Sequence, residues 1–360
     1  MMAARSADMP GLRVGLVAPP WVSVPPAMYG GTEAVIDTLA RGLVAQGHHV
    51  ILCTVGDATC PVPRAWVYRE PVAPMGKTLP ELFQVTSAYE LLSDCDVVHD
   101  HTDAGPLWGG GRPGMPPIVT TVHNPFTRER RAVLAAAASV GVGVVAISHD
   151  QAARAGPVPI AAVVHHGLDL TRFTVGDGNG EYAMFVGRFT PEKGADLAVA
   201  IARSAGVRLL MASKMREPDE KAYFAERIEP ELGNDVVYLG EISPSDRNRY
   251  LRDAVALVNP IRWAEPFGLV MVEALACGTP VVGFPAGAAP EIVEHGVTGF
   301  LVDDVDAGAA ALRRIAEIDR GACRRWVEAR FRDDRMVSEY VAVYRRLMRR
   351  HAPHRPARAS

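Results

Sequence analysis

The stretch from Gly176 to Phe189, "GDGNGEYAMFVGRF", divides the chain into two halves. Its first six residues have the composition of a flexible linker, and a β-forming apolar run follows at once. Short apolar runs alternate with helical patterns before this stretch, and the same alternation starts again after it. Near-continuous apolar strands between helices are typical of a parallel sheet covered on both faces. The sequence therefore predicts two doubly wound α/β domains joined near residue 175.

The strands expected on this basis are spread evenly over both halves. In the first half they are 13–19, 49–55, 96–101, 118–123, 143–148 and 161–167, and in the second half 182–189, 207–213, 235–241, 255–260 and 280–285. Helices are expected between them, for example over 32–47 and 79–94. The end of the chain is also expected to be helical, except for a Pro- and Arg-rich tail, 351–360, which we expect to be disordered.

Composition excludes several classes of protein. A length of 360 residues exceeds that of the usual single domain, and the formal charge of -3 argues against a general nucleic-acid binder. No apolar run reaches the roughly 20 residues that span a bilayer. The first residues lack the apolar centre of a signal peptide, so a cytoplasmic protein is expected, with at most peripheral membrane contact through the basic tail. The five cysteines form no CxxC pair and are expected to be reduced thiols.

Two facing domains would leave a cleft between them, and ligands of such sheets bind at the carboxyl ends of strands. The segment "APPWVSVPPAMYGGTE", 18–33, follows the first strand and leads into a helix opened by Gly30 and Gly31. Small residues there let a ligand approach backbone N–H groups, and the helix dipole favours an anion. The loop is not GxGxxG, which counts against a dinucleotide-binding site. A plain turn remains the alternative.

The segment "VGRFTPEKG", 186–194, occupies the corresponding place in the second half. Arg188 and Lys193 lie five positions apart across a turn, and Gly194 opens the next helix. Two cations beside a helix N-terminus suit a diphosphate, whose charge must be balanced when a bond to it breaks. A solvated charged turn is the alternative, but lysine is rare in this chain, and we favour phosphate binding.

A third segment, "RWAEPFGLVMVEALACG", 262–278, keeps two glutamates within an apolar run. Residues from Pro266 onward are expected to form a helix, so that Glu265 lies just outside its N-terminus and Glu273 about two turns in. Eight residues span roughly 12 Å along a helix axis. That is too far for the carboxylate pair of a glycosidase, which needs roughly 5 to 9.5 Å. The spacing suits the two ends of an extended ligand such as a nucleotide diphosphate sugar.

Histidines end two strands of the first half, in "HDH" (99–101) and "TVHN" (121–124). His99 and His101 have a spacing that metal ligands adopt on a strand, but no carboxylate or cysteine partners lie nearby in the sequence. We therefore expect one of these histidines to line a sugar or acceptor pocket, with zinc as the alternative. The Gly-rich stretch 109–114 is expected to be a surface loop.

These motifs together resemble the retaining glycosyltransferases of family 4, which have the GT-B fold. "YGGTE", "GRFTPEKG", "EPFGLVMVE", "CGTPVV" and "GVTGFLV" occur in the order and spacing typical of that family, over about residues 12–350. The resemblance implies an acceptor-side domain over 1–172 and a donor-binding domain over 173–332. It also implies a C-terminal helix, 333–350, that packs back on the first domain.

The resemblance also implies roles for individual residues. Glu265 would hold the donor sugar, Glu273 the ribose, and Arg188 with Lys193 the diphosphate, while His123 would lie beside the reacting sugar. Further donor contacts would come from Gly30, Gly31, Gly187, Gly240, Ile242, Phe267, Gly268 and Leu269. The acceptor would contact Tyr29, Glu33, His101, Trp108 and Asn124. The family's chemistry retains the anomeric configuration and needs no metal or other cofactor.

The sequence thus predicts a retaining glycosyltransferase that uses a nucleotide diphosphate sugar, UDP rather than GDP, and a hydroxyl acceptor. The sugar, the acceptor and the oligomeric state are left open. A nucleotide-sugar epimerase of the same architecture is one alternative, and it would form product without an acceptor. A non-catalytic nucleotide-sugar-binding protein is another, and it would bind donor without transfer or hydrolysis. A dehydrogenase is disfavoured because the dinucleotide fingerprint is missing.

Overall fold

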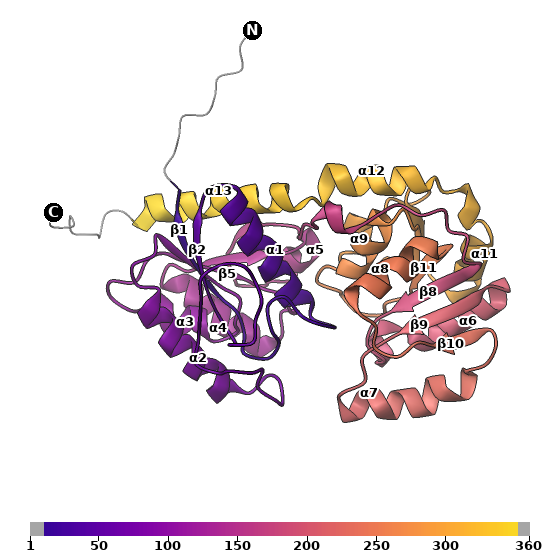
Figure 1. Cartoon of the computed structure of the whole chain (residues 1–360), viewed down its shortest axis with the longest axis horizontal. Helices are drawn as coiled ribbons and strands as arrows, with labels where there is room; N and C mark the ends of the chain where they lie inside the picture. Colours follow the sequence, from indigo (N-terminus) through magenta and orange to yellow (C-terminus); the bar gives the residue numbers. More distant parts are fainter. Residues whose placement is uncertain (1–10, 352–360) are drawn as a thin grey trace, which may run out of the picture.

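The computed structural model describes residues 11–351, which form two parallel sheets with helices on both faces (Figure 1). Residues 1–10 lie outside this range, as does the tail that was expected to be disordered, apart from His351. Strand order is β3-β2-β1-β4-β5-β6-β7 in the first sheet and β10-β9-β8-β11-β12-β13 in the second. Both sheets therefore contain the doubly wound order in which the first strand lies between the second and the fourth.

The first sheet runs from Arg13 to Val163, and its strands alternate with helices. The strands are β1 (Arg13–Val17), β2 (His49–Thr54), β3 (Arg64–Trp66), β4 (Val97–Asp100), β5 (Ile118–Thr121), β6 (Gly143–Ala146) and β7 (Ile160–Val163). The helices are α1 (Gly31–Ala45), α2 (Thr78–Leu91), α3 (Gly105–Gly110), α4 (Arg128–Ser139) and α5 (His149–Ala153). β4, β5 and β6 are buried along their whole length, as expected for strands covered on both faces.

The second sheet begins at Tyr182 and repeats the alternation. Its strands are β8 (Tyr182–Val186), β9 (Arg208–Ala212), β10 (Val236–Tyr238), β11 (Ala256–Asn259), β12 (Val281–Gly283) and β13 (Gly299–Leu301). The helices are α6 (Ala195–Ala205), α7 (Pro218–Tyr223), α8 (Pro244–Asp253), α9 (Leu269–Ala276), α10 (Ala289–Ile292), α11 (Val305–Arg313) and α12 (Arg320–Arg330).

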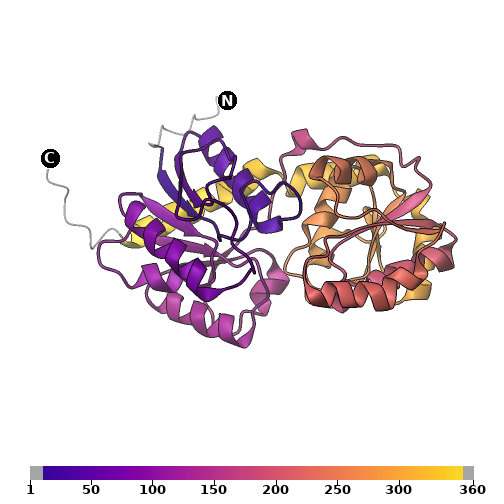
Figure 2. The ribbon, with the colours of Figure 1, turned by 60° about the horizontal axis from the view of Figure 1, so that its bottom comes forward.

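The last helix, α13 (Asp333–His351), returns to the first domain. Its buried face, which includes Val337, Tyr340 and Tyr344, belongs to the same core cluster as Val14 of β1. A side chain at Gly42 of α1 would begin 2.5 Å from Val337, so glycine lets these two helices approach closely. The yellow helices α12 and α13 therefore run along both domains (Figures 1 and 2).

Three local expectations were wrong. The helix in the third segment begins at Leu269 rather than at Pro266, because Gly268 has a left-handed φ of 97° that no continuing helix accepts. Glu273 consequently lies in the second turn, nearer the helix N-terminus than predicted. Gly109 and Gly110 end α3 instead of forming a surface loop, and Gly109 is buried where a side chain would collide with Tyr89.

Two short edge strands, β3 and β13, were not predicted from the sequence. Each has three residues, too few for an alternating or apolar pattern to stand out. Within residues 11–351, none of the helices has the length and apolar character needed to cross a membrane.

Candidate active site

A cavity of about 770 Å³ lies between the two domains and is lined by residues of both. It opens where loops leave the carboxyl ends of the first and fourth strands of each sheet, the position at which doubly wound sheets bind ligands. Most of the predicted site residues line it: Arg188, Lys193, Glu265, His123, Gly30, Gly31, Gly187, Phe267, Gly268, Leu269, Glu273, Tyr29, Glu33, His101 and Asn124. Gly240, Ile242 and Trp108 are not among its lining residues.

Lys193 and Glu265 meet on the second-domain side of the cavity. Lys193 ends a short 3-10 helix after β8, and its Nζ donates to Glu265 Oε2 at 2.5 Å. Trp263 Nε1 donates to the same oxygen at 2.8 Å, and the lysine also lies 5.1 Å from the Trp263 ring centroid. Both charged side chains are largely buried, at 14% and 13% exposed. The carboxylate is thus held in place by two donors, and the lysine is directed at the loop before α9.

The loop that carries Glu265 is fixed by close backbone contacts. Gly268 precedes α9 in the left-handed conformation, and no side chain caps the N-terminal N–H groups of this helix. Gly268, Leu269 and Val270 line the cavity. Gly287 lies against the backbone of Glu265, where an added Cβ would be 2.2 Å from its nitrogen. Ala288 N–H donates to the Glu265 carbonyl at 3.0 Å. These contacts hold Glu265 beside the start of a helix, where an anion is stabilised.

Glu273 is buried one turn further into α9 and pairs with Arg247 of α8, whose Nη2 donates to its Oε1 at 2.7 Å. Burial raises the pKa of Glu273 above its ordinary value, although Arg247 and Arg172 oppose the shift. The arginine was missed by sequence reasoning, because nothing in "PSDRNRYLRD" marks one of its three arginines as facing the cavity.

Further cations line the second-domain side. Arg188 lies 3.8 Å from the buried carboxylate of Glu220, which also caps α7. Lys214 follows β9 and is buried, which lowers the pKa of its ammonium group. Lys214 was also missed. It could have been found, because it is one of only four lysines in the chain and directly follows a predicted strand. Together these side chains make the second-domain wall cationic.

The first-domain loop 18–30 faces this wall. Gly31 begins α1, and an added Cβ there would lie 3.5 Å from Leu269 of the other domain. The Tyr29 ring centroid lies 5.1 Å from Lys214 Nζ, so the aromatic face meets a cation across the cavity. Glu33 is buried in the first turn of α1, and burial raises its pKa to about 7.

Four histidines form a row in the first domain beside the cavity. His101 Nδ1 and His123 Nε2 are 2.9 Å apart, the His99 and His101 ring centroids are 4.1 Å apart, and His123 stacks on His166 at 5.4 Å. Burial lowers the pKa of His99 to about 3 and that of His123 to about 4. It also lowers the pKa values of His101 and His166 well below normal. The row is therefore neutral at pH 7.

The zinc alternative at His99 and His101 does not fit this geometry. His99 Nδ1 lies 2.7 Å from the Tyr344 hydroxyl and its Nε2 lies 2.8 Å from Thr121 Oγ1, so both ring nitrogens are engaged by protein hydroxyls. Thr121 in turn bonds Tyr340 at 2.9 Å. His99 therefore ties the first sheet to α13 and has no nitrogen left for a metal ion.

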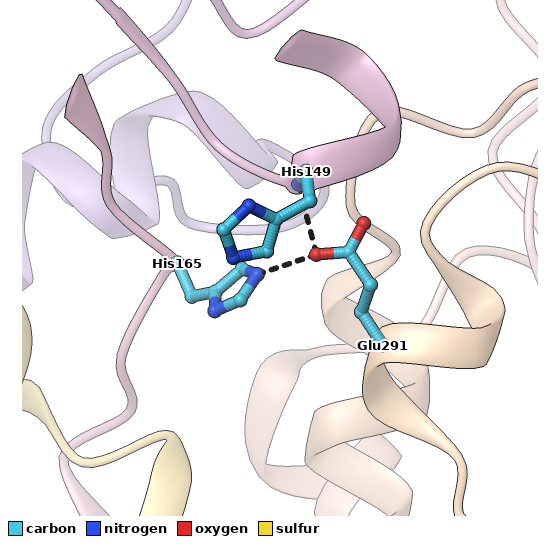
Figure 3. Close-up of side chains that lie close together, drawn as sticks. All are labelled: His149, His165 and Glu291. Atoms are coloured by element: carbon cyan, nitrogen blue, oxygen red, sulfur yellow. Dashed lines mark hydrogen bonds and ion pairs between the residues drawn. The ribbon is translucent and has the colours of Figure 1, made fainter. Parts of the chain in front are cut away.

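Another group of possible metal ligands, His149, His165 and Glu291, lies where the two domains touch (Figure 3). His165 Nε2 donates to Glu291 Oε2 at 2.7 Å, and backbone N–H groups of the first domain donate to both carboxylate oxygens. Although burial alone raises it, the pKa of Glu291 is lowered by these hydrogen bonds. The sequence did not point to His165 or Glu291, because contacts between domains leave no local pattern.

Comparisons with known proteins agree with this geometry. Residues 29–172 match the family described as "Glycosyltransferase Family 4", and residues 180–317 match "Glycosyl transferases group 1". The D-inositol 3-phosphate glycosyltransferase of Mycobacterium marinum is 38% identical over 188 residues, which are 47% of this chain and 40% of that protein. The alignment thus covers well under half the length of this relative.

Solved glycosyltransferase structures align over nearly the whole chain. AviGT4, involved in avilamycin A biosynthesis, superposes with a TM-score of 0.71 at 28% identity and covers 94% of this chain and 98% of its own. Anabaena Alr3699/HepE, solved with UDP and glucose, has a TM-score of 0.75 at 18% identity, covering 93% and 100%. The chain therefore belongs to the family 4 glycosyltransferases and has their GT-B fold.

Proposed function

We propose that the protein is a retaining glycosyltransferase that moves a sugar from a nucleotide diphosphate sugar to a hydroxyl group. The observation that carries this proposal is the Lys193–Glu265 pair at the N-terminus of α9. It combines a cation and free helix N–H groups, which suit a leaving diphosphate, with a carboxylate that can accept hydrogen bonds from sugar hydroxyls.

The donor lies along α9 in this proposal. The sugar binds at Glu265, the diphosphate lies between Lys193, Arg188 and the helix N-terminus, and the ribose hydroxyls donate to Glu273. Arg247 pairs with Glu273 and opposes the rise in its pKa that burial causes. We favour UDP over GDP, since a structural neighbour, Anabaena Alr3699/HepE, was solved with UDP and glucose.

The chemistry needs no nucleophilic side chain. The acceptor hydroxyl attacks the anomeric carbon from the face that the diphosphate leaves, so the configuration is retained. The bond from that carbon to the diphosphate oxygen breaks, and the departing diphosphate takes the acceptor's proton. Lys193 and Arg188 stabilise the charge that develops on it, which is where a fixed cation accelerates the step. His123, neutral and beside the cavity, contacts the reacting sugar.

The acceptor faces the first-domain wall, near Tyr29, Glu33, His101 and Asn124. Within the described chain, this side of the cavity contributes four carboxylates (Glu33, Glu81, Asp103, Asp169), and its only arginine or lysine is Arg172. A phosphate or carboxylate would need cationic partners there. We therefore propose an acceptor without such groups, in contrast to the phosphorylated inositol named for the Mycobacterium relatives.

A screen of UDP- and GDP-sugars by thermal shift, followed by transfer assays, tests the proposal. A ligand that binds only the folded state raises the unfolding temperature. We expect UDP-sugars to do so and the best one to release UDP in the presence of a neutral polyol or sugar acceptor. Two results would contradict the assignment. One is conversion of the donor sugar to an epimer in the absence of an acceptor. The other is donor binding with neither sugar transfer nor slow donor hydrolysis.

A further inference from the structure

The carboxylate of Glu291 joins the two domains directly (Figure 3). It extends from α10 of the second domain and accepts hydrogen bonds from three donors of the first domain. These are the backbone N–H groups of His149 at 2.9 Å and Asp150 at 2.7 Å, and the His165 ring at 2.7 Å. Ser148 occupies the remaining donor of this turn by accepting from Gln151 N–H. The contact is therefore charge-assisted and specific in direction.

The same turn that carries Glu291 also holds the donor loop. Ala288 N–H donates to the Glu265 carbonyl, and Gly287 packs on the Glu265 backbone with no room for a side chain. Glu291 lies only three positions after Ala288, which is the residue directly before α10. A shift of Glu291 relative to the second domain would consequently move the backbone that supports Glu265.

We propose that Glu291 is a positioning residue that couples closure of the two domains to the placement of Glu265. When the first domain contacts Glu291, the 287–291 turn is held against the loop 264–268, and Glu265 is kept beside Lys193. When the contact opens, that support is lost. This inference rests on the proposed role of Glu265 in donor binding, but the contact itself can be tested without a donor.

A metal ion is the other occupant that these residues suggest. His149, His165 and Glu291 place ligand atoms within 4.8 Å of one another. Both Glu291 oxygens, however, already accept from N–H groups, and the His165 nitrogen nearest the carboxylate is the one that donates to it. Metal binding would require His165 Nε2 to lose its proton and the ion pair to separate. The geometry therefore favours the direct contact.

The first experiment compares Glu291→Gln with Glu294→Gln. Glu294 lies three residues on with an exposed side chain, so it is a matched control for loss of one charge. Spin labels at Glu90→Cys in α2 and Glu226→Cys report the distance between domains, because all five native cysteines are buried. We expect a narrow distribution for the ligand-free parent and the Glu294 control, and a broader, longer one for Glu291→Gln. An unchanged distribution overturns the proposal.

The second measurement separates positioning from folding. For Glu291→Gln we expect kcat/KM for a UDP-sugar to fall about tenfold, the size expected for losing a charge-assisted hydrogen bond. UDP affinity and the unfolding temperature should match the Glu294 control, because the charged side chains proposed to hold the nucleotide, Lys193, Arg188 and Glu273, all belong to the second domain. If the parent protein did not bind UDP, the proposed function itself would be refuted. Equal kcat/KM in both variants would refute only the coupling.

A backbone variant provides an independent test. His149 is the first residue of α5, where proline is tolerated, and Ser148 has a ψ of 162° that a following proline accepts. His149→Pro removes one N–H donor to Glu291, whereas His149→Ala removes the ring and keeps the N–H. We expect only the proline variant to broaden the distance distribution. Micromolar binding of Zn²⁺ that His149→Ala abolishes would overturn the proposal in favour of a metal site.

Discussion

The second-domain wall of the cavity carries Arg188, Lys193, Lys214 and Arg247, whereas the first-domain wall carries a row of neutral, buried histidines and several carboxylates. Two of these cations pair with carboxylates, in the Lys193–Glu265 and Arg247–Glu273 contacts. The second-domain wall thus suits a polyanion, whereas the first-domain wall disfavours one. A reaction in which an anion leaves toward one side and a neutral group attacks from the other requires this division.

Removing Lys193 should reduce the function of the cationic second-domain wall more than any other change considered below. We expect Lys193→Ala to lower kcat by about 10²–10³-fold, because a fixed charge that stabilises a leaving group is worth several kcal/mol. UDP release measures it, with Lys221→Ala, an exposed lysine of the same domain, as control. If Lys193→Ala kept the parent's kcat, Lys193 would have no role in the reaction.

Glu273 tests the far end of the same wall. We expect Glu273→Ala to weaken nucleotide binding about ten- to hundredfold with a smaller effect on kcat, since it removes an acceptor for the ribose and leaves Arg247 unpaired in a buried place. Calorimetric titration with UDP measures the affinity. If the variant lost kcat while its UDP affinity was unchanged, the ribose assignment would be wrong.

The histidine row predicts a pH dependence of stability. Unfolded histidine titrates near pH 6.5, but burial lowers the pKa of His99 to about 3 in the folded protein. Between these values the unfolded state binds more protons, so the contribution of His99 to the free energy of unfolding is lost as pH falls. The destabilisation caused by His99→Asn should therefore shrink by up to about 1.4 kcal/mol per pH unit below pH 6.5.

Denaturant unfolding at pH 7.5, 6 and 5 checks this sign. The control is His49→Asn, because His49 is exposed and lies outside the histidine row. A difference between parent and His99→Asn that stays constant, or grows toward acid pH, would show that folding does not lower the pKa of His99.

Chelation should have the smallest effect. Because protein cations lie where a diphosphate would need balancing charge, we propose that transfer requires no divalent ion, and that EDTA leaves the rate within about twofold. Rates measured after extensive EDTA treatment and dialysis test this. Loss of activity that Mg²⁺ or Mn²⁺ restores would assign the charge balance to a metal.

The residues of the site differ in how well the sequence predicts them. The strands, their alternation with helices and the segments around Lys193 and Glu265 carry local signals, namely apolar runs, glycines at turns and rare lysines after strands. Arg247 and Glu291 have no such signal, since their positions depend on which helices meet in space. The start of α9 was predicted too early, because the sequence does not show that Gly268 adopts a left-handed conformation. The zinc alternative failed because Tyr344, 245 residues away, occupies His99.

The most direct test of the donor site is a calorimetric comparison of UDP with UMP, run on the parent protein and on Lys193→Ala. The account predicts that the parent binds UDP at least tenfold more tightly than UMP, and that most of this advantage disappears in the variant, because the second phosphate contacts the cationic wall. Equal affinity for UDP and UMP in the parent, or an advantage that survives in Lys193→Ala, would contradict it.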